Sequence, residues 1–553
     1  MWPWLLLLLP GGFSREFSLK DKSIYFIVVD RFARDDASNV SYCDETADWV
    51  NNTGGGYCGG TLNGIANHLD YIQGMGFDCI WITPVVESNG YMGYDAVDLW
   101  KINRHFGSQE DLRALSKELH RREMCLVLDI VVNHMRPLVV KGKLNLSLVP
   151  FDQESHYNQR GLENQSFEEY LLAWPPPAFD PSADNENLRN LSMGSKVCGP
   201  GVFEHTECAC FPGNSGPNCP SFSEKDLSTG YLGVMGDLNH SHPFVRQTLL
   251  RWVKEMVQNY SLDALRLDTA IYLERDFLPE IQAAAGVEIL GEATVNNLTF
   301  HASLQGESGV AALLNFPPFY HLPEAFCGYR IGGVFGDYSM QGTWLDKPNL
   351  WGLGAVLQLQ LSSDFYDHDL LGNFADNHDE YSRLAHYCKQ DTLRIQQALV
   401  WVMTMQGIPI VYYGTEQGLD GHQSPSNTKG QDALRESLWQ TGYRRDTWQY
   451  LLLRKLNRLR RLFGSSRAEI QNFTENTLVF TRADAWVFLN NAPNTTQLVP
   501  QRYCPGPEPG AGWRWIDALS EEPMDAYLAG GCFDAPDKFP KVLVQRTRAP
   551  VLL

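Results

Sequence analysis

Three carboxylate residues of this chain each follow a short apolar run: Asp268 ends ALRLD, Glu292 ends EILGE, and Asp379 ends NFADNHD. Apolar runs of this length are typical of buried β-strands, and residues that follow parallel strands gather at one edge of the sheet. Cleavage of a glycosidic bond needs one carboxylate to attack the anomeric carbon, a second to protonate the leaving oxygen, and a third to stabilise the developing positive charge. A lone strand-end Asp is usually a helix cap or an ion-pair partner, so the hypothesis rests on the set.

The elements that must position these carboxylates alternate along the chain. Helix-like segments, such as 109–122 and 243–259, separate eight strand-like runs. Near-continuous apolar strands joined by helices predict a parallel sheet buried on both faces, and eight such units predict a closed (β/α)8 TIM barrel. On this pattern alone, a doubly wound open sheet is the alternative. The eight runs are 23–30, 79–83, 125–132, 264–268, 288–292, 311–316, 370–375 and 407–413.

Two stretches break the alternation. The long gap after the third strand is rich in Pro, Gly, Asn and Cys, which predicts a small inserted domain, and the short alternating runs after residue 466 predict a C-terminal antiparallel β domain. We therefore divide the chain into a short signal peptide (1–15), a barrel domain (16–134 and 237–466), an inserted domain (135–236) and a C-terminal β domain (467–553).

Composition excludes some classes of protein. The chain has 553 residues and a formal net charge of −20, which argues against binding to nucleic acid because the phosphates would be repelled. Apart from a short apolar run at 2–9, no stretch approaches the roughly 20 apolar residues of a membrane span. We expect a monomer without a membrane span.

Cysteines and glycosylation sequons favour the secretory route. None of the 12 cysteines forms a zinc-like pair of CxxC motifs, and those at 198, 208, 210 and 219 suggest an oxidised loop framework. Cys79 and Cys125 lie inside apolar strand patterns and are expected to be free buried thiols. Secretion to the extracellular space or the lumen of the secretory pathway is the expected localisation. The sequons begin at Asn39, Asn51, Asn145, Asn164, Asn190, Asn239, Asn259, Asn297, Asn472 and Asn494.

Several motifs in a fixed order make the chain resemble the α-amylases of glycoside hydrolase family 13, and in particular the secreted fungal-type enzymes. The resemblance extends from about Ser23 to beyond Arg460. Any one motif alone would be weak evidence, but their order makes the resemblance specific. The motifs include SIYFIVVDRFARDD (23–36), YCGGTLNGI (57–65), DIVVNHM (129–135), NYSLDALRLDT (259–269), ILGEA (289–293), NFADNHD (373–379) and GIPIVYYGTEQ (407–417).

The resemblance implies a role for each candidate site residue. Asp268 matches the nucleophile, Glu292 the general acid/base with a raised pKa, and Asp379 the stabiliser of the transition state. Arg266, on the same strand face as Asp268, would hold that carboxylate ionised. The expected substrate-binding residues are Tyr94, His134, Arg266 and His378.

The resemblance also implies a structural Ca²⁺ between the barrel and the inserted domain. Asn133, Asp237 and the backbone carbonyl of Tyr272 match ligand positions, while the ligand from the inserted domain is not placed.

Two disulfides are expected as well. Cys43 and Cys58 flank a Gly-rich loop that resembles the first disulfide loop of the family. Cys504 and Cys532 are the only cysteines of the C-terminal domain and are the natural second pair.

The chain departs from the fungal-type pattern at three places. Ile271 and Tyr272 replace a Lys-His pair that meets the sugars on the leaving-group side, which predicts a less polar subsite there. Met92 replaces a histidine of the cleavage site, and Asp95 stands where a tryptophan is common. These changes leave the product pattern open.

The sequence thus predicts a secreted, endo-acting, retaining hydrolase of α-1,4-glucans such as starch or glycogen. An α-glucosidase or a glucanotransferase on the same scaffold is the enzymatic alternative, and only the acceptor subsites decide between them. A non-catalytic, amylase-like glycan-binding protein is the alternative from another class. Such proteins typically lack at least one of the three carboxylates, and this chain keeps all three.

Overall fold

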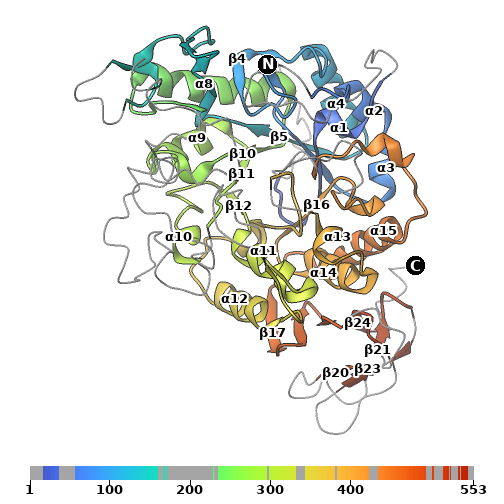
Figure 1. Ribbon diagram of the computed structural model, residues 1–553. Coiled ribbons are helices and arrows are strands. Elements are labelled where there is room, and N and C mark those ends of the chain that lie inside the picture. The colour runs from blue at the N-terminus through green and yellow to red at the C-terminus, as the bar shows by residue number, and fades with distance from the viewer. Residues whose placement is uncertain are drawn as a thin grey trace, which may run out of the picture.

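The computed structural model in Figure 1 surrounds a central barrel with helices and places a smaller sheet below it. It describes residues 17–35, 56–159, 166–167, 171, 228, 235–295, 298–331, 343–379, 383–421, 434–492, 501–503, 515–521, 523–524, 533–535 and 537–545.

Eight parallel strands close into a barrel, as the alternating pattern predicts. Each predicted run contains one strand, and the parallel pairing of the first strand with the last excludes the open doubly wound sheet. In order around the barrel the strands are β1 (Ile24–Ile27), β16 (Ile408–Tyr412), β15 (Leu371–Asn373), β12 (Ala312–Leu314), β11 (Glu288–Gly291), β10 (Ala264–Leu267), β5 (Cys125–Ile130) and β2 (Cys79–Ile82).

Helices cover the outside of the barrel, and local sequence explains where two of them begin. Helix α4 (Gln109–Arg121) starts at a capping box, in which the Ser108 hydroxyl accepts from the Asp111 amide and the Asp111 carboxylate accepts from the Ser108 amide. Helix α8 (Pro243–Tyr260) opens with proline. Backbone N–H groups in the first turn of a helix have no partner within the helix, so proline loses no hydrogen bond at this position. The apolar faces of both helices pack on the barrel, which fixes the strand ends in space.

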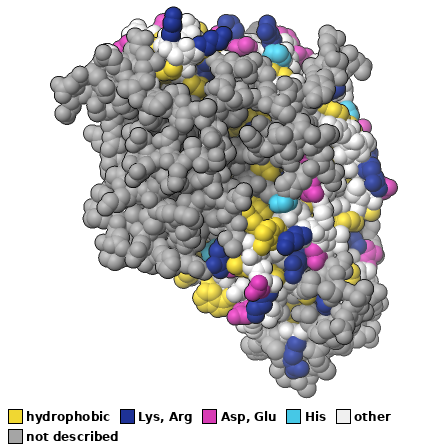
Figure 2. All heavy atoms as spheres, in the orientation of Figure 1, with side chains coloured by type: hydrophobic (Ala, Val, Ile, Leu, Met, Phe, Trp, Pro, Cys, Tyr) yellow, Lys and Arg dark blue, Asp and Glu magenta, His cyan; other side chains and the backbone are white. Residues whose placement is uncertain are grey.

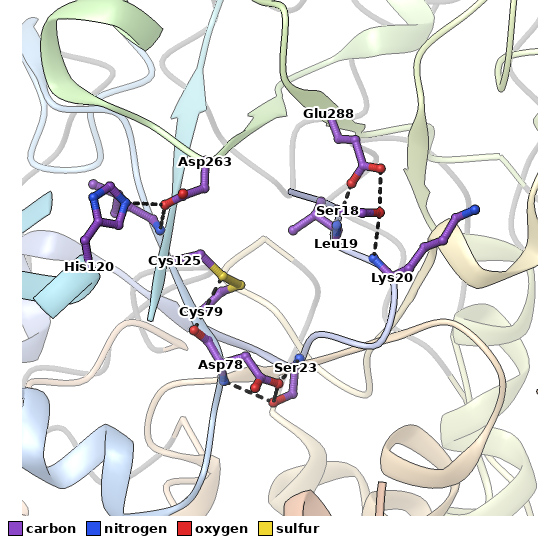
Figure 3. The surroundings of a disulfide bond; sticks show 11 residues. Ser18, Leu19, Lys20, Ser23, Asp78, Cys79, His120, Cys125, Asp263 and Glu288 are labelled. Atoms are coloured by element: carbon purple, nitrogen blue, oxygen red, sulfur yellow. Dashed lines mark hydrogen bonds and ion pairs between the residues drawn. A yellow bond between two sulfur atoms is a disulfide. The ribbon is translucent and has the colours of Figure 1, made fainter. Parts of the chain in front are cut away.

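A disulfide joins Cys79 and Cys125, so the expectation of two free thiols is wrong. The two residues are register partners on the neighbouring strands β2 and β5, with Cα atoms 4.4 Å apart. Paired residues on adjacent strands point to the same face, which brings their sulfur atoms within bonding reach. Figure 3 shows this bond at the amino-terminal end of the strands, beside the Asp78 carboxylate that accepts from the Ser23 amide and hydroxyl.

A second disulfide, Cys327–Cys388, joins η3 (Pro323–Cys327) to the end of α13 (Leu384–Tyr387). Cys58 is disulfide-bonded. The expected partner Cys43, and the pair Cys504 and Cys532, lie outside the described residues.

The described ends of the inserted region return to the barrel as two paired strands. Strand β6 (His134–Pro137) runs antiparallel to β9 (Met235–Asp237), with His134 opposite Asp237. This pairing brings residues about one hundred positions apart to the same edge of the barrel. Beside it, β7 (Val139–Val140) and β8 (Lys143–Leu144) form a short hairpin.

A six-stranded sheet follows the barrel in the range expected for the C-terminal β domain, and Figure 1 places it below α12 (Trp351–Leu361) and α14 (Thr392–Thr404). The buried Arg482 side chain donates to the carbonyls of Thr404 and Met405 at the end of α14, which ties the sheet to the barrel. In sheet order the strands are β17 (Ala468–Phe473), β18 (Thr477–Arg482), β19 (Ala485–Asn490), β24 (Lys541–Gln545), β21 (Trp515–Asp517) and β22 (Pro523–Met524).

The described surface is mixed in charge. Figure 2 shows basic and acidic side chains next to one another over the coloured part of one face. In the described part of the chain, no helix combines the length and the apolar character needed to cross a membrane.

Candidate active site

The carboxyl ends of β10 and β11 place two of the predicted catalytic residues side by side. Leu267 and Gly291, the last residues of these strands, are register partners, and Asp268 and Glu292 directly follow them. Inside the barrel, Arg266 of β10 is the register partner of Asp129 of β5. Three carboxylates from three adjacent strands therefore converge on the position of Arg266.

The Arg266 guanidinium holds these three carboxylates together. Its Nη1 lies 2.9 Å from Oδ1 of Asp129 and 2.7 Å from Oδ1 of Asp268, while its Nη2 lies 2.8 Å from Oε1 of Glu292. Arg266 and Asp129 are fully buried, and Asp268 and Glu292 nearly so. Burial of one cation with several carboxylates makes the protonation of each depend on the others.

Glu292 has the environment of a carboxylic acid that keeps its proton near neutral pH. Burial raises its pKa to about 7, and the neighbouring Asp268 and Asp379 charges add to the rise against the attraction of Arg266. Its Oε2 accepts from the backbone amide of Thr269 at 2.9 Å. Thr269 has a φ of 50°, an unusual conformation for a β-branched residue. The tight turn after β10 thus aims an amide at Glu292.

Two opposing effects act on the pKa of Asp268: burial and the Arg266 guanidinium. Burial raises the pKa of Asp268 above its ordinary value, Arg266 opposes this rise, and the Asp379 charge adds to it. The 2.7 Å contact with Arg266 favours the ionised form that a nucleophile needs.

Asp379 is the most open of the three predicted catalytic residues, with 36% of its side chain exposed. Its Oδ2 lies 2.9 Å from Nε2 of His378 and its Oδ1 lies 3.1 Å from Nη2 of Arg435. Burial alone would raise its pKa, but His378, Arg435 and Arg266 hold the pKa well below the ordinary value. Asp379 is therefore a fixed negative charge.

The predicted sugar-binding residues lie against the same cluster. The Tyr94 hydroxyl donates to Oδ2 of Asp129 at 2.7 Å, and its ring stacks on the His378 ring with centroids 5.4 Å apart. Nε2 of His134 lies 3.1 Å from the Tyr94 carbonyl oxygen. Burial lowers the pKa of His134 to about 4, so this imidazole is neutral at neutral pH and donates through Nε2. The structure thus brings together all seven predicted catalytic and substrate-binding residues.

Sequence reasoning missed three residues of this cluster. Asp129 lies within the predicted strand run 125–132, and its role beside Arg266 becomes visible only through the register of β5 and β10. Trp81 donates through Nε1 to Oδ2 of Asp129 at 3.1 Å. Arg435 follows no strand and belongs to no motif used above, so no signal in the sequence pointed to its contact with Asp379.

The residues that depart from the family pattern occupy buried positions. Oδ1 of Asp95 accepts from the Gly90 amide at 3.0 Å, and burial raises the Asp95 pKa to about 6. This carboxylate therefore closes the turn that precedes it. Met92 is buried in the apolar core, and Ile271 and Tyr272 are buried directly after the strand that presents Asp268.

A second polar cluster surrounds Asp237 where the inserted region meets the barrel. Nδ2 of Asn158 donates to Oδ2 of Asp237 at 2.6 Å, and Nδ2 of Asn133 lies 3.5 Å from Oδ1. Oδ1 of Asn133 is buried without a hydrogen-bond partner. Burial raises the pKa of Asp237 well above its ordinary value, and within the described ranges no Lys, Arg or His forms an ion pair with it. Tyr272, the third predicted ligand, ends η2 (Ala270–Tyr272) after Asp268.

The family of this chain follows from its similarity to known proteins. The catalytic-domain model of the α-amylase family matches residues 26–144 and 357–462. Alpha-amylase 2 of Schwanniomyces occidentalis is 33% identical over 459 residues, which cover 81% of this chain and 73% of that protein. Alpha-amylase 1 of the same yeast is 32% identical over 489 residues, covering 87% and 78%. An α-amylase structure from Malbranchea cinnamomea superposes with a TM-score of 0.72 at 27% identity, covering 96% of this chain and 97% of that one. The chain belongs to the α-amylase family of glycoside hydrolases.

Proposed function

We propose that this protein is an endo-acting α-amylase that hydrolyses α-1,4-glucosidic bonds with retention of the anomeric configuration. The observation that carries the proposal is the Arg266 bridge, in which separate nitrogens of one guanidinium hold Asp268 and Glu292. Two carboxyl groups held by one guanidinium stand close together, as a retaining pair about 5–5.5 Å apart must.

In the first step, a carboxylate oxygen of Asp268 attacks the anomeric carbon while the bond to the leaving oxygen breaks. The leaving oxygen takes the proton of Glu292, whose pKa of about 7 lets it carry that proton near neutral pH. Asp379, kept ionised by His378 and Arg435, stabilises the positive charge that develops on the ring.

In the second step, water attacks the anomeric carbon of the glycosyl-Asp268 ester and gives a proton to Glu292. The ester bond breaks, Asp268 leaves as a carboxylate, and the product is released as the α-anomer. Both residues return to their starting states, so the cycle needs no other reactant.

The Asp237 cluster is the proposed structural Ca²⁺ site. Asn133 Oδ1 offers an unused buried acceptor, and Asp237 offers a carboxylate whose pKa is raised by burial. Oxygen ligands of this kind suit a hard cation. Asn158, already in contact with Asp237, would supply the ligand from the inserted region, and the Tyr272 carbonyl would complete the proposed set. When bound, Ca²⁺ would neutralise Asp237 and join the inserted region to the barrel.

The disulfides support a secreted protein that acts on starch or glycogen outside the cell or in the secretory lumen. Disulfides persist in oxidising compartments and are rare in the cytosol.

Product analysis on soluble starch tests the proposal. NMR should detect the α-anomer first, and early products should be a mixture of oligosaccharides. Initial release of a β-anomer would remove Asp268 from its proposed role. Glucose as the sole early product would instead indicate an α-glucosidase, and longer or cyclic oligosaccharides would indicate a transferase.

Active-site substitutions supply the control. Asp268→Asn and Glu292→Gln should each lower kcat by several orders of magnitude, roughly 10³-fold or more, and circular dichroism should show that both proteins remain folded. A folded Asp268→Asn protein that keeps full activity would overturn the mechanism.

A further inference from the structure

Arg31 is a fully buried arginine to which the proposed mechanism gives no role. It lies in α1 (Val29–Phe32), which follows the carboxyl end of β1, and so on the face of the barrel that holds the carboxylate cluster. Charged side chains are rarely buried completely without specific partners, because burial removes their hydration. The partners of Arg31 therefore indicate its role.

The Arg31 guanidinium joins three segments that are distant in the sequence. Its Nε lies 2.9 Å from Oδ2 of the buried Asp30, which in turn accepts from the Cys58 amide at 2.7 Å. Its Nη2 donates to the carbonyl oxygen of Gly56 at 2.8 Å. Its Nη1 donates to the carbonyl oxygen of Arg435 at 3.0 Å. The planar fork of a guanidinium fixes these three directions together, which the single ammonium group of a lysine cannot do.

Tyr91 connects Arg31 to the side chain of Arg435. The Arg31 guanidinium lies over the Tyr91 ring, with Cζ 3.9 Å from the ring centroid, and a cation in this place is attracted by the electrons of the ring. The Tyr91 hydroxyl oxygen accepts from Nη1 of Arg435 at 3.3 Å. Arg31 thus binds the backbone of Arg435, Tyr91 binds its guanidinium, and Arg31 packs on Tyr91.

The backbone on either side of Arg435 is held in the same way. Arg435 belongs to no helix or strand of the described chain. The Tyr412 hydroxyl donates to the Leu434 carbonyl at 3.1 Å, and the Tyr413 hydroxyl donates to the Glu436 carbonyl at 2.8 Å. These hydrogen bonds replace those of regular secondary structure, so buried side chains fix three consecutive carbonyl groups at this point.

The place of Arg435 matters for the reaction because its guanidinium contacts Asp379. Nη2 of Arg435 lies 3.1 Å from Oδ1 of Asp379, the residue proposed to stabilise the positive charge of the transition state. Such stabilisation depends on a charge that is already oriented before the reaction begins. A displaced Arg435 would release Asp379 from this orientation.

We propose that Arg31 and Tyr91 are positioning residues of the hydrolysis reaction, which set the place of Arg435 and, through Arg435, the orientation of the Asp379 carboxylate. The inference rests on the proposed hydrolysis of α-glucans. Because Asp379 is proposed to act in the transition state, loss of either positioning residue should lower kcat and leave KM almost unchanged.

Tyr91→Phe tests the proposal with the least disturbance, because it keeps the ring beneath Arg31 and removes the hydroxyl group that Arg435 contacts. It should lower kcat for maltoheptaose roughly 3- to 10-fold with less than about a twofold change in KM, as loss of one hydrogen bond to a group that acts in the transition state predicts.

Tyr450→Phe is the matched control. Tyr450 is equally buried, and its hydroxyl donates to the Tyr71 carbonyl at 3.0 Å. This bond joins α15 (Trp448–Arg460) to α3 (Leu69–Gly74), two helices on the outside of the barrel in Figure 1. Tyr450→Phe therefore removes one buried hydrogen bond of the same kind, and it should leave kcat and KM unchanged.

A double-mutant cycle distinguishes positioning from a general loss of structure. If Tyr91 acts through Arg435, Tyr91→Phe should lower kcat no further in an Arg435→Met background. The same loss in both backgrounds, or an unchanged kcat for Tyr91→Phe in the unmodified background, would overturn the inference.

Arg31→Lys is the second variant, since it keeps the charge beside Asp30 but cannot make all three bonds of the fork. It should lower kcat roughly 10-fold and add little to Arg435→Met. Arg482→Lys, at a buried arginine that donates to carbonyls at the end of α14, should leave kcat unchanged. If Arg31→Lys does not fold, the cycle with Tyr91→Phe decides alone.

A crystal structure of Tyr91→Phe gives a readout that does not depend on activity. The Arg435 guanidinium should leave its 3.1 Å contact with Asp379, and an Arg435 side chain that stays in place would contradict the inference. Failure of the unmodified enzyme to hydrolyse any α-glucan would refute the proposed function instead.

Discussion

Arg435 Nη2 lies 3.1 Å from Oδ1 of Asp379, and Nε of the same guanidinium donates to the carbonyl oxygen of His378 at 3.0 Å. The His378 imidazole contacts the other carboxylate oxygen of Asp379. Asp379 is thus held by His378 on one side and by Arg435 on the other, and Arg435 also fixes the backbone of His378. This arrangement keeps the carboxylate ionised and oriented although burial favours its protonation.

Removal of the Arg435 charge should impair the chemical step. Arg435→Met should lower kcat/KM roughly 10- to 100-fold, because a charge-assisted hydrogen bond and the orientation of Asp379 are lost together. The pKa of Asp379 should rise, so the acidic limb of the pH–rate profile should move to higher pH. Arg435→Lys should recover part of the activity.

Arg444→Met is the matched control for this substitution, since Arg444 forms an exposed ion pair with Asp446 at 3.1 Å. Exposed pairs contribute little, so its kinetics should not change. Equal kinetics for Arg435→Met and the unmodified enzyme would contradict the role of Arg435.

The proton on Glu292 should set the basic limb of the pH–rate profile. The pKa of about 7 means that the acid form is lost as the pH rises through 7, so kcat/KM should fall about tenfold per pH unit above that point. Glu292→Gln should remove this limb along with most of the activity. A basic limb that persists unchanged in the residual activity of Glu292→Gln would assign the general acid elsewhere.

The raised pKa of Glu292 should also lower the stability of the folded protein at high pH. A carboxyl group whose folded pKa exceeds its unfolded value destabilises the folded state increasingly as the pH rises from the unfolded pKa, 4.5, to the folded value. Glu292→Gln removes the titrating group, so it should raise the melting temperature at pH 8 and have little effect at pH 4. Comparable melting curves at pH 8 would contradict the raised pKa. The trade of stability for activity is common at catalytic sites.

The sequence predicted the barrel and most of the active site because both follow from local patterns. Apolar runs of strand length marked all eight strands, and the ends of three runs marked Asp268, Glu292 and Asp379. Contacts between distant segments left no such signal. Arg435 reaches Asp379 through tertiary packing alone, and Asn158 meets Asp237 through the antiparallel bridge between Tyr157 and Leu238. The Cys79–Cys125 bond was missed because an apolar strand suits both a buried thiol and a disulfide, and only the register of β2 and β5 separates them.

The Cys79–Cys125 disulfide should stabilise the barrel without affecting catalysis. It closes a loop with a sequence separation of 46, for which the chain-entropy model predicts a stabilisation of about 4 kcal/mol. Cys79→Ala with Cys125→Ala should lower the melting temperature measured by calorimetry. The kcat should not change, because the bond lies at the amino-terminal ends of the strands, away from the carboxylates. Cys79→Val with Cys125→Val keeps more of the buried volume and separates the loss of the cross-link from a cavity effect. A double variant that melts like the unmodified protein would show that the bond contributes nothing.

Asp237→Asn should have opposite effects with and without Ca²⁺. In the metal-free protein the buried Asp237 carboxylate has a raised pKa, so its ionised form destabilises the fold at neutral pH, and the neutral amide removes that penalty. With Ca²⁺ present, the carboxylate neutralises the ion and binding stabilises the folded state by mass action. In EDTA the Asp237→Asn protein should therefore melt at a higher temperature than the unmodified protein, and in millimolar Ca²⁺ at a lower one.

Glu154→Gln, at an exposed residue of the same inserted region, should melt like the unmodified protein in both conditions. A melting temperature of the unmodified protein that does not respond to Ca²⁺ or EDTA would refute the proposed metal site. Stabilisation by Asp237→Asn in both conditions would show that this carboxylate is a buried charge without a cation partner.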